Sequence, residues 1–203
     1  MEEKSVRIPN QKRSIEKKEK IIMAAYEIFN IKGYFETNTA EIAVAAGVST
    51  GSVYAYFKDK KDILLICLEM FGEELTQKIC SAIAQTVESD TGNAAKNVLR
   101  IFVESHFAKR IFHDEVMSLL YRDEDVKIAF MQMERSMMSA IARELAKIGL
   151  DFTHEREQTY LLFTLVKGIE EQLAFEESSD IDKNILIEES ARIMSAMFKY
   201  HKN

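Results

Sequence analysis

The chain has 203 residues, 47% hydrophobic and 30% charged, with a net charge of −6. This length allows a substantial core in one domain or two small ones. The negative charge would argue against a nucleic-acid ligand if it were spread evenly, but it is not. Residues 1–61 carry eleven basic and eight acidic side chains, which leaves a net charge of −9 for residues 62–203. A basic amino-terminal part on an acidic remainder is compatible with DNA binding, although acidic surfaces also serve solubility alone.

The composition predicts an all-helical protein. Pro9 is the only proline, so no later position is barred from a helix interior. Alternation of Val, Ile and Thr over strand lengths is absent, and we expect no sheet. The longest apolar runs, near 63–68 and 161–163, are too short to span a membrane, and the amino terminus lacks a signal-peptide core, so we expect a cytoplasmic protein. Cys67 and Cys80 are expected to be free thiols.

The chain begins with a basic segment that precedes the first helix. Residues 1–13 are predicted to form a flexible basic arm, either a solvated tail or a contact to a DNA minor groove. The first helix is predicted from about 14 to 32. Apolar residues recur there with helical spacing and are expected to face the core, namely Ile21, Ile22, Ala25, Ile28 and Phe29.

The next stretch has the start and stop signals of two short helices. Asn38 can cap the first of them, with Glu41 reaching back to complete a capping box. Gly47 can end it with a positive φ, as a tight turn between helices requires. Ser49 can then cap the second helix.

The second short helix has two different faces. Val53 and Phe57 lie four residues apart and are predicted to point inward. The outward arc is small and polar, and lysines follow it; these residues are Gly51, Ser52, Tyr54, Ala55, Lys58, Lys60 and Lys61. Small side chains allow a helix to enter the major groove, and hydroxyls and lysines can contact bases and phosphates. An alanine-rich hairpin packed inside a bundle is the alternative.

The run A-x3-G-V-S-x-G-x-V-Y-x-Y-F-K-x-K, from Ala43 to Lys60, resembles the TetR family of helix-turn-helix transcriptional regulators. The resemblance extends over about 15–75, with the motif at about 38–57. It implies a DNA-binding domain at 14–61 and a helical effector-binding and dimerisation domain at 62–203. It also implies base-edge contacts by Thr50, Gly51, Ser52 and Ala55, and phosphate contacts by Thr39, Tyr54, Tyr56, Lys58 and Lys60. Many relatives have a larger residue at Ala55, which leaves the operator sequence open.

Apolar periodicity predicts six further helices, which gives about nine in a larger antiparallel bundle behind a three-helix head. Their expected ranges are 60–86, 94–110, 114–121, 123–148, 153–177 and 182–201. A turn-rich break is expected at 90–93. Four glycines are predicted to end helices, namely Gly33, Gly47, Gly92 and Gly149.

The body is rich in Met and Phe, which in most proteins means only an ordinary core. The resemblance to TetR regulators implies more, namely an effector pocket between the fifth and eighth helices. Its candidate lining is Phe102, His106, Phe107, Met117, Tyr121, Phe130, Met133, Met137 and Phe163. The last two helices are apolar on more than one side, which predicts a two-fold homodimer. Candidate interface residues are Tyr160, Thr164, Gly168, Phe175, Ile193 and Met197.

Searches for catalytic chemistry find none of the common motifs for metal proteases, redox dithiols, phosphate loops or nucleophile elbows. His106 and His113 could share a helix face near Asp114, but a helix break is expected between them and no third ligand follows at the right spacing. Adjacent carboxylates such as Glu170 and Glu171 are most simply a solvated face. We therefore expect no metal, no cofactor, no catalytic residue and no enzymatic activity.

These observations favour a DNA-binding transcriptional regulator, most simply a repressor. The resemblance implies a homodimer on a near-palindromic operator, released by a small hydrophobic effector that carries one polar or anionic group. Two rival classes stay open. One is a DNA-anchored adaptor whose body binds a protein, and the other is a helical enzyme that uses the same pocket.

Overall fold

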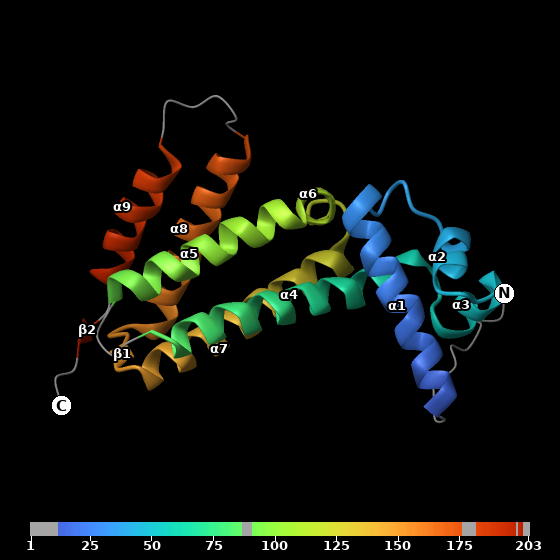
Figure 1. The fold of residues 1–203 in the computed structure, drawn as a ribbon, viewed down its shortest axis with the longest axis horizontal. Helices are drawn as coiled ribbons and strands as arrows, with labels where there is room; N and C mark the ends of the chain where they lie inside the picture. Colours follow the sequence, from blue (N-terminus) through green and yellow to red (C-terminus); the bar gives the residue numbers. More distant parts are fainter. Residues whose placement is uncertain (1–11, 87–90, 176–181, 198, 201–203) are drawn as a thin grey trace. The chain divides into compact units, whose positions relative to one another are not determined.

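A computed structural model describes residues 12–86, 91–175, 182–197 and 199–200 (Figure 1). Nine α-helices and one short strand pair are found in these residues. In chain order they are α1 (Lys12–Lys32), α2 (Thr39–Ala45), α3 (Thr50–Tyr56), α4 (Lys60–Ala84), α5 (Thr91–Ala108), α6 (Arg110–Leu119), α7 (Glu124–Lys147), β1 (Leu150–Asp151), α8 (Glu155–Phe175), α9 (Lys183–Ser195) and β2 (Lys199–Tyr200). The predicted all-α fold is confirmed.

The chain forms two compact units. The head unit comprises Met1–Phe71 and Lys109–Met131, and the body unit comprises Gly72–Ala108 and Gln132–Asn203. The head unit therefore includes α6 as well as α1, α2 and α3, while α4 and α7 contribute residues to both units. The predicted domain limits of 14–61 and 62–203 stay a prediction.

The head core is built around α1, which packs against α2, α3 and α6. Ile21, Ala25 and Phe29 are fully buried, whereas Ile22 and Ile28 are only half-buried. The buried face of α1 is therefore rotated from the predicted one, and it also includes Ala24 and Tyr26. The exposed side of α1 carries basic residues, among them Lys12, Arg13, Lys17 and Lys20.

The body core lies between α5, α8 and α9, and Figure 1 shows α8 and α9 side by side in orange and red. Leu99 of α5 is fully buried. Val166 and Ile169 of α8 and Met194 of α9 are almost completely buried. Each of these helices thus turns one apolar face inward, which is the arrangement expected of an amphipathic helix in a bundle.

Two expectations about helix ends need correction. Gly33, Gly47 and Gly149 have φ values of +88°, +66° and +77°, as their predicted role in helix ends requires. Gly92, in contrast, lies in the first turn of α5, which begins at Thr91. The helix predicted for 114–121 begins four residues earlier, at Arg110, because the break between α5 and α6 occurs at Lys109.

The carboxy-terminal helix is shorter than predicted. It ends at Ser195, and the chain then pairs Leu150 with Tyr200 and Asp151 with Lys199 in an antiparallel ladder. The expectation of no sheet is wrong to this small extent, because a two-residue ladder is too short to produce an alternation pattern. Of the predicted arm, residues 1–11 lie outside the described part of the chain. Within that part, no helix combines the length and apolar content needed to cross a membrane.

Candidate nucleic-acid interface

The helix α2 begins with the predicted capping box. The Asn38 side chain accepts hydrogen bonds from the backbone N–H groups of Ala40 and Glu41, both at 3.0 Å. Glu41 Oε2 accepts from the Asn38 N–H at 3.1 Å and also pairs with Lys32 Nζ. These bonds satisfy amide groups that the first turn of a helix leaves unpaired. The cap predicted from the sequence is confirmed.

The turn between α2 and α3 depends on Gly47. Its φ of +66° is in the left-handed region, while nothing lies within 4 Å of where a Cβ would be, so conformation rather than space requires glycine there. The Val48 N–H donates to the Ala43 carbonyl at 2.9 Å and closes the turn. Ser49 then caps α3 by accepting from the Ser52 N–H at 3.2 Å, as predicted.

The two faces of α3 differ as the sequence indicates. Val53 is fully buried and Phe57, just after the helix, is 2% exposed. Thr50, Gly51 and Ala55 are exposed and Ser52 is half-buried. The outward face of α3 therefore consists of small side chains with two hydroxyl groups, close to the capped amino terminus of the helix.

Two further predicted contact residues lie beside this face. Tyr54 is 49% exposed, and its hydroxyl is 2.9 Å from the Thr39 hydroxyl of α2. This hydrogen bond joins two predicted phosphate contacts, one from each helix of the motif. Lys58 is exposed beyond the end of α3. With the outer face of α3, these residues form a single surface.

Tyr56 and Lys60 are held by the protein itself. Tyr56 is 7% exposed, and its hydroxyl lies 2.8 Å from Ser14 Oγ of α1. Lys60 Nζ donates to the carbonyls of Tyr34 and Thr37 at 2.5 and 2.6 Å and lies 4.1 Å from the centre of the Tyr34 ring. Burial lowers the pKa of Lys60. Their predicted phosphate contacts stay predictions, but both polar groups already have partners.

The α6 helix and the residues on either side of it are tied to this region by polar contacts within the head unit. The Glu115 carboxylate accepts from the backbone N–H groups of Tyr34 and Phe35. A Cβ at Gly33 would overlap that carboxylate, so Gly33 is needed both for its φ and for this approach. Lys109 Nζ donates to the Tyr26 hydroxyl at 2.5 Å.

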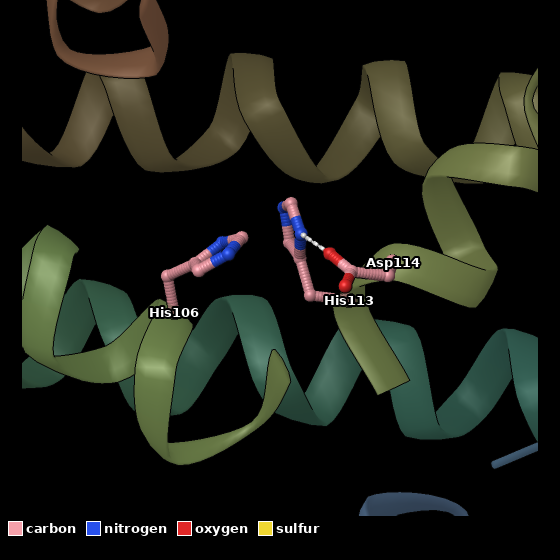
Figure 2. A group of neighbouring side chains, drawn as sticks. All are labelled: His106, His113 and Asp114. Atoms are coloured by element: carbon pink, nitrogen blue, oxygen red, sulfur yellow. Dashed lines mark ion pairs between the residues drawn. The ribbon is translucent and has the colours of Figure 1, made fainter. Parts of the chain in front are cut away.

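Lys61 makes a third link of this kind. Its ammonium lies 2.6 Å from Asp125 Oδ2 and 3.1 Å from Asp123 Oδ2. The hydrogen bonds that Lys61 donates to the Asp125 and Asp123 carboxylates raise its pKa. Within α6 itself, the imidazole of His113 approaches the Asp114 carboxylate, with 3.7 Å between Nδ1 and Oδ1 (Figure 2). Sequence analysis did not predict the links of Lys61, Lys109 and Glu115, because their partners are distant along the chain.

In the body unit, a cavity of about 40 Å³ lies between α5, α7, α8 and α9. Of the nine predicted pocket residues, Phe102 and Phe163 line it, with their ring centres 5.7 Å apart. The lining consists of Ala94, Ala95, Val98, Phe102, Met138, Ile141, Ala142, Leu145, Phe152, Thr159, Leu162, Phe163, Val166 and Met194. The alanines were missed because a small residue beside a cavity leaves no hydrophobic signal.

The other predicted pocket residues lie elsewhere. Phe107 is 39% exposed, and the Lys183 ammonium lies over its ring, 5.3 Å from the ring centre. Tyr121 of the head unit is 91% exposed. His106 is buried, with Nδ1 2.8 Å from Glu170 Oε1. The remaining four are Met117 and Phe130 of the head unit and Met133 and Met137 of α7 in the body unit. As a ligand-binding set, the nine residues stay a prediction.

The predicted dimer residues lie along α8 and α9. Tyr160 is 66% exposed, Thr164 and Gly168 are exposed on the same side of α8, and Ile193 of α9 is 57% exposed. A Cβ added at Gly168 would meet nothing within 4 Å. Met197 is half-buried, and the side chain of Phe175 lies outside the described part.

Comparison with known proteins identifies the amino-terminal region. The family described as bacterial regulatory proteins, tetR family, matches residues 21–66, which contain all of α2 and α3. The fatty acid metabolism regulator protein of Bacillus subtilis is 36% identical over 88 residues, or 43% of this chain and 42% of that protein. The transcriptional regulator HbdR of Aromatoleum is 42% identical over 64 residues, or 32% of this chain and 28% of that regulator. The chain thus spans less than half the length of these two relatives.

Solved structures extend the likeness to the whole fold. A protein from Mesorhizobium loti assigned to the TetR family superposes with a TM-score of 0.74 at 21% identity, covering 93% of this chain and 99% of that one. The multidrug binding protein EbrR, complexed with imidazole, superposes with a TM-score of 0.69 at 15% identity, covering 97% and 100%. At this identity the structures show the fold alone. Residues 21–66 thus match the tetR family of bacterial regulatory proteins, and the chain as a whole has the fold of solved structures assigned to that family.

Proposed function

We propose that this protein is a sequence-specific DNA-binding transcriptional regulator, a repressor that a small hydrophobic molecule releases from its operator. The observation that carries the proposal is the surface of α3. Thr50, Gly51, Ser52 and Ala55 face outward, while Val53 anchors the helix in the head core. A helix with so little bulk on its outer face can enter a major groove, and its hydroxyls can contact base edges.

In this proposal the remaining contacts go to phosphates. Tyr54 and Thr39 present hydroxyls on one side of α3, and Lys58 presents an ammonium beyond its end. Exposed basic residues of α1 add positive charge to the same unit. Phosphate contacts fix the register of a protein on DNA, whereas base-edge contacts select the sequence. Lys60 and Tyr56 act instead by holding α1, α3 and the start of α4 in place.

Two lysines of similar position allow a matched test of this surface. Lys58 is exposed, whereas Lys61 is paired with Asp123 and Asp125. Lys58→Ala should weaken operator binding and lower the slope of log K against log salt by about one, because one phosphate contact releases one counterion. Lys61→Ala should leave the slope unchanged. Equal slopes for Lys58→Ala and the wild type would remove Lys58 from the interface.

Base selection is tested with a second pair. Thr50→Val retains size but removes a hydroxyl from the outer face of α3, and it should relax preference at particular base pairs by about 1–3 kcal/mol. Thr153→Val, at an exposed position of the body unit, serves as the control. Selection from a random-sequence library should return a near-palindromic site for the wild type. If it returns no symmetric motif, the proposed operator is wrong.

The palindrome follows from a proposed homodimer. Tyr160, Thr164 and Gly168 recur along one exposed side of α8, and Gly168 leaves space for a partner helix. Two copies would bury this side together with Ile193 of α9, and two recognition helices would meet half-sites about 34–36 Å apart.

Sedimentation at micromolar concentration should show a species of twice the 23.3 kDa chain mass. Thr164→Arg should shift the protein toward monomer, because it places an unpaired charge in the proposed interface. Gln172→Arg, on an exposed position of the same helix, is the control. A wild-type protein that sediments only as a monomer would contradict the dimer and the symmetric operator together.

The effector is proposed to enter the cavity of the body unit, where Phe102 and Phe163 meet. Two proteins similar to this chain are described by their names as a fatty acid metabolism regulator and a multidrug binding protein. Because the relatives are transcriptional regulators, we propose no enzymatic step, and we place the protein in the cytoplasm with chromosomal DNA. A body that binds another protein but no small molecule would favour the adaptor instead.

A further inference from the structure

The cavity of the body unit is apolar on all the sides that the described residues form. Thirteen of its fourteen lining residues are Ala, Val, Leu, Ile, Met or Phe, and Thr159 has the only polar side chain among them. None of these lining residues is ionisable. A carboxylate, phosphate or ammonium group placed there would lose its hydration without gaining a counter-charge, which is costly. This lining therefore favours an uncharged ligand.

The hydroxyl of Thr159 already donates one hydrogen bond within α8. It donates to the Glu155 carbonyl one turn earlier in α8, with 2.5 Å between the oxygens. A hydroxyl has one proton to donate and two lone pairs that accept. While this bond is kept, Thr159 can only accept a hydrogen bond from a ligand. A ligand with an O–H or N–H group satisfies it, whereas an ether or ester presents a second acceptor.

The nearest buried ionisable groups do not alter this conclusion. His106 and Glu170 lie one helical turn beyond the lining residues Phe102 and Val166, on α5 and α8. Their side chains approach each other with 2.8 Å between Nδ1 and Oε1. A carboxylate paired in this way supplies no positive charge to an anionic ligand, and His106 is already engaged.

Three alanines and two methionines of the lining determine how large a ligand the cavity can accept. The cavity of about 40 Å³ is far smaller than the roughly 300–1,000 Å³ of occupied small-molecule pockets, so a ligand must displace part of the wall. Met138 and Met194 are suited to this because a thioether chain changes shape at low cost. Ala94, Ala95 and Ala142 have no such freedom, and each added methyl group there removes space.

We propose that the body unit binds an uncharged, mainly hydrocarbon ligand with one hydrogen-bond donor, such as an alcohol or a phenol. Thr159 selects the donor and Ala142 limits the size. The inference specifies the effector of the function proposed above and rests on it. It departs from the sequence-based expectation, which left room for an anionic group on the effector.

The test uses three probes of matched length, namely 1-decanol, decyl methyl ether and decanoate, titrated calorimetrically into the full-length protein without DNA. The alcohol should bind about tenfold more tightly than the ether, which cannot donate, and the carboxylate should bind more weakly than the ether. A carboxylate that binds as tightly as the alcohol would overturn the proposal, as would failure of all three to bind.

Substitutions in the lining test which residues cause the preference for the alcohol and the limit on ligand size. Thr159→Val retains the shape of the side chain and should abolish the preference for the alcohol over the ether. Thr153→Val, at an exposed position of the body unit, should retain the preference. Ala142→Val should weaken the alcohol and the ether alike. A preference that survives in Thr159→Val would show that another group selects the donor.

Operator release is measured separately with the same probes. Binding in the expected order together with release supports both the ligand class and the repressor mechanism. Binding in that order without release supports the ligand class and contradicts the effector-responsive function. Operator binding by a protein that binds none of the probes contradicts the ligand class and leaves DNA recognition standing.

Discussion

The head unit and the body unit are each stabilised internally by a different kind of interaction. In the head, directional polar contacts fix the backbone, among them the Asn38 capping box, the Lys60 ammonium on two carbonyls and the Glu115 carboxylate on two amides. In the body, α5, α7, α8 and α9 surround an apolar cavity in whose lining Thr159 has the only polar side chain. Polar contacts of fixed geometry allow few alternative arrangements, whereas an apolar wall with methionines can adapt.

This difference suits the proposed roles of the two units. A recognition helix must present its outer face in one orientation, because base edges are distinguished by the placement of donors and acceptors. A ligand site that is small when empty must be able to widen. Pairs of matched substitutions, one in each unit, test how far the difference extends.

The largest effect is expected for truncation of two phenylalanines. Phe57→Ala removes a ring that is 2% exposed and should lower the free energy of unfolding by about 3–5 kcal/mol. Phe163→Ala removes a half-buried ring beside the cavity and should cost about 1 kcal/mol, since less apolar area is lost. Urea unfolding followed by circular dichroism measures both. Equal losses would mean that the body is as tightly packed as the head.

The converse test adds side-chain volume at one buried position in each unit. Ala43 in α2 is 1% exposed and its carbonyl accepts the bond that closes the turn, so Ala43→Val should destabilise the protein by about 1–3 kcal/mol. Ala142→Val extends into the cavity and should change stability by less than about 0.5 kcal/mol. The same unfolding measurement applies. A loss above 1 kcal/mol for Ala142→Val would show that the cavity cannot accept two more carbon atoms.

Removal of the Lys60 charge should destabilise the protein about as much as overfilling at Ala43. Lys60→Met keeps the length of the side chain but leaves the carbonyls of Tyr34 and Thr37 without their donor, at a cost of about 0.5–1.5 kcal/mol for each bond. The exposed Lys58→Met is the control for loss of charge and should not change stability measurably. If Lys60→Met lowers the salt slope of operator binding without loss of stability, Lys60 contacts phosphate instead.

The smallest effect concerns the two thiols, one in each unit. Burial raises the pKa of Cys67 in the head to about 12. At pH 8 only about one molecule in ten thousand would then carry the reactive thiolate. Burial also raises the pKa of Cys80, but this side chain is half-buried and within reach of solvent. Iodoacetamide labelling read by mass spectrometry should modify Cys80 first.

Cys67 should react only when urea unfolds the head. Raising the pH should have little effect on Cys67 until the pH approaches its raised pKa, because the neutral thiol is the form that the folded head favours. Labelling of both thiols at the same rate in buffer would mean that burial in the head does not protect Cys67.

The sequence by itself determined those features whose cause is local. Helix caps and the turn at Gly47 depend on residues within five positions of each other, so Asn38, Glu41 and Ser49 could be assigned their roles directly. The inward face of α3 follows from the spacing of Val53 and Phe57. The all-α class follows from helical periodicity and from the single proline at Pro9.

Tertiary structure decided what depends on partners distant in sequence. Ser14 engages Tyr56 across 42 positions, and Glu115 reaches the amide of Tyr34 across 81. Periodicity shows which side of a helix is apolar, but it does not show which neighbour covers that side or how completely. For the same reason the cavity, which arises where small residues such as Ala142 leave space between helices, could not be read from any one segment.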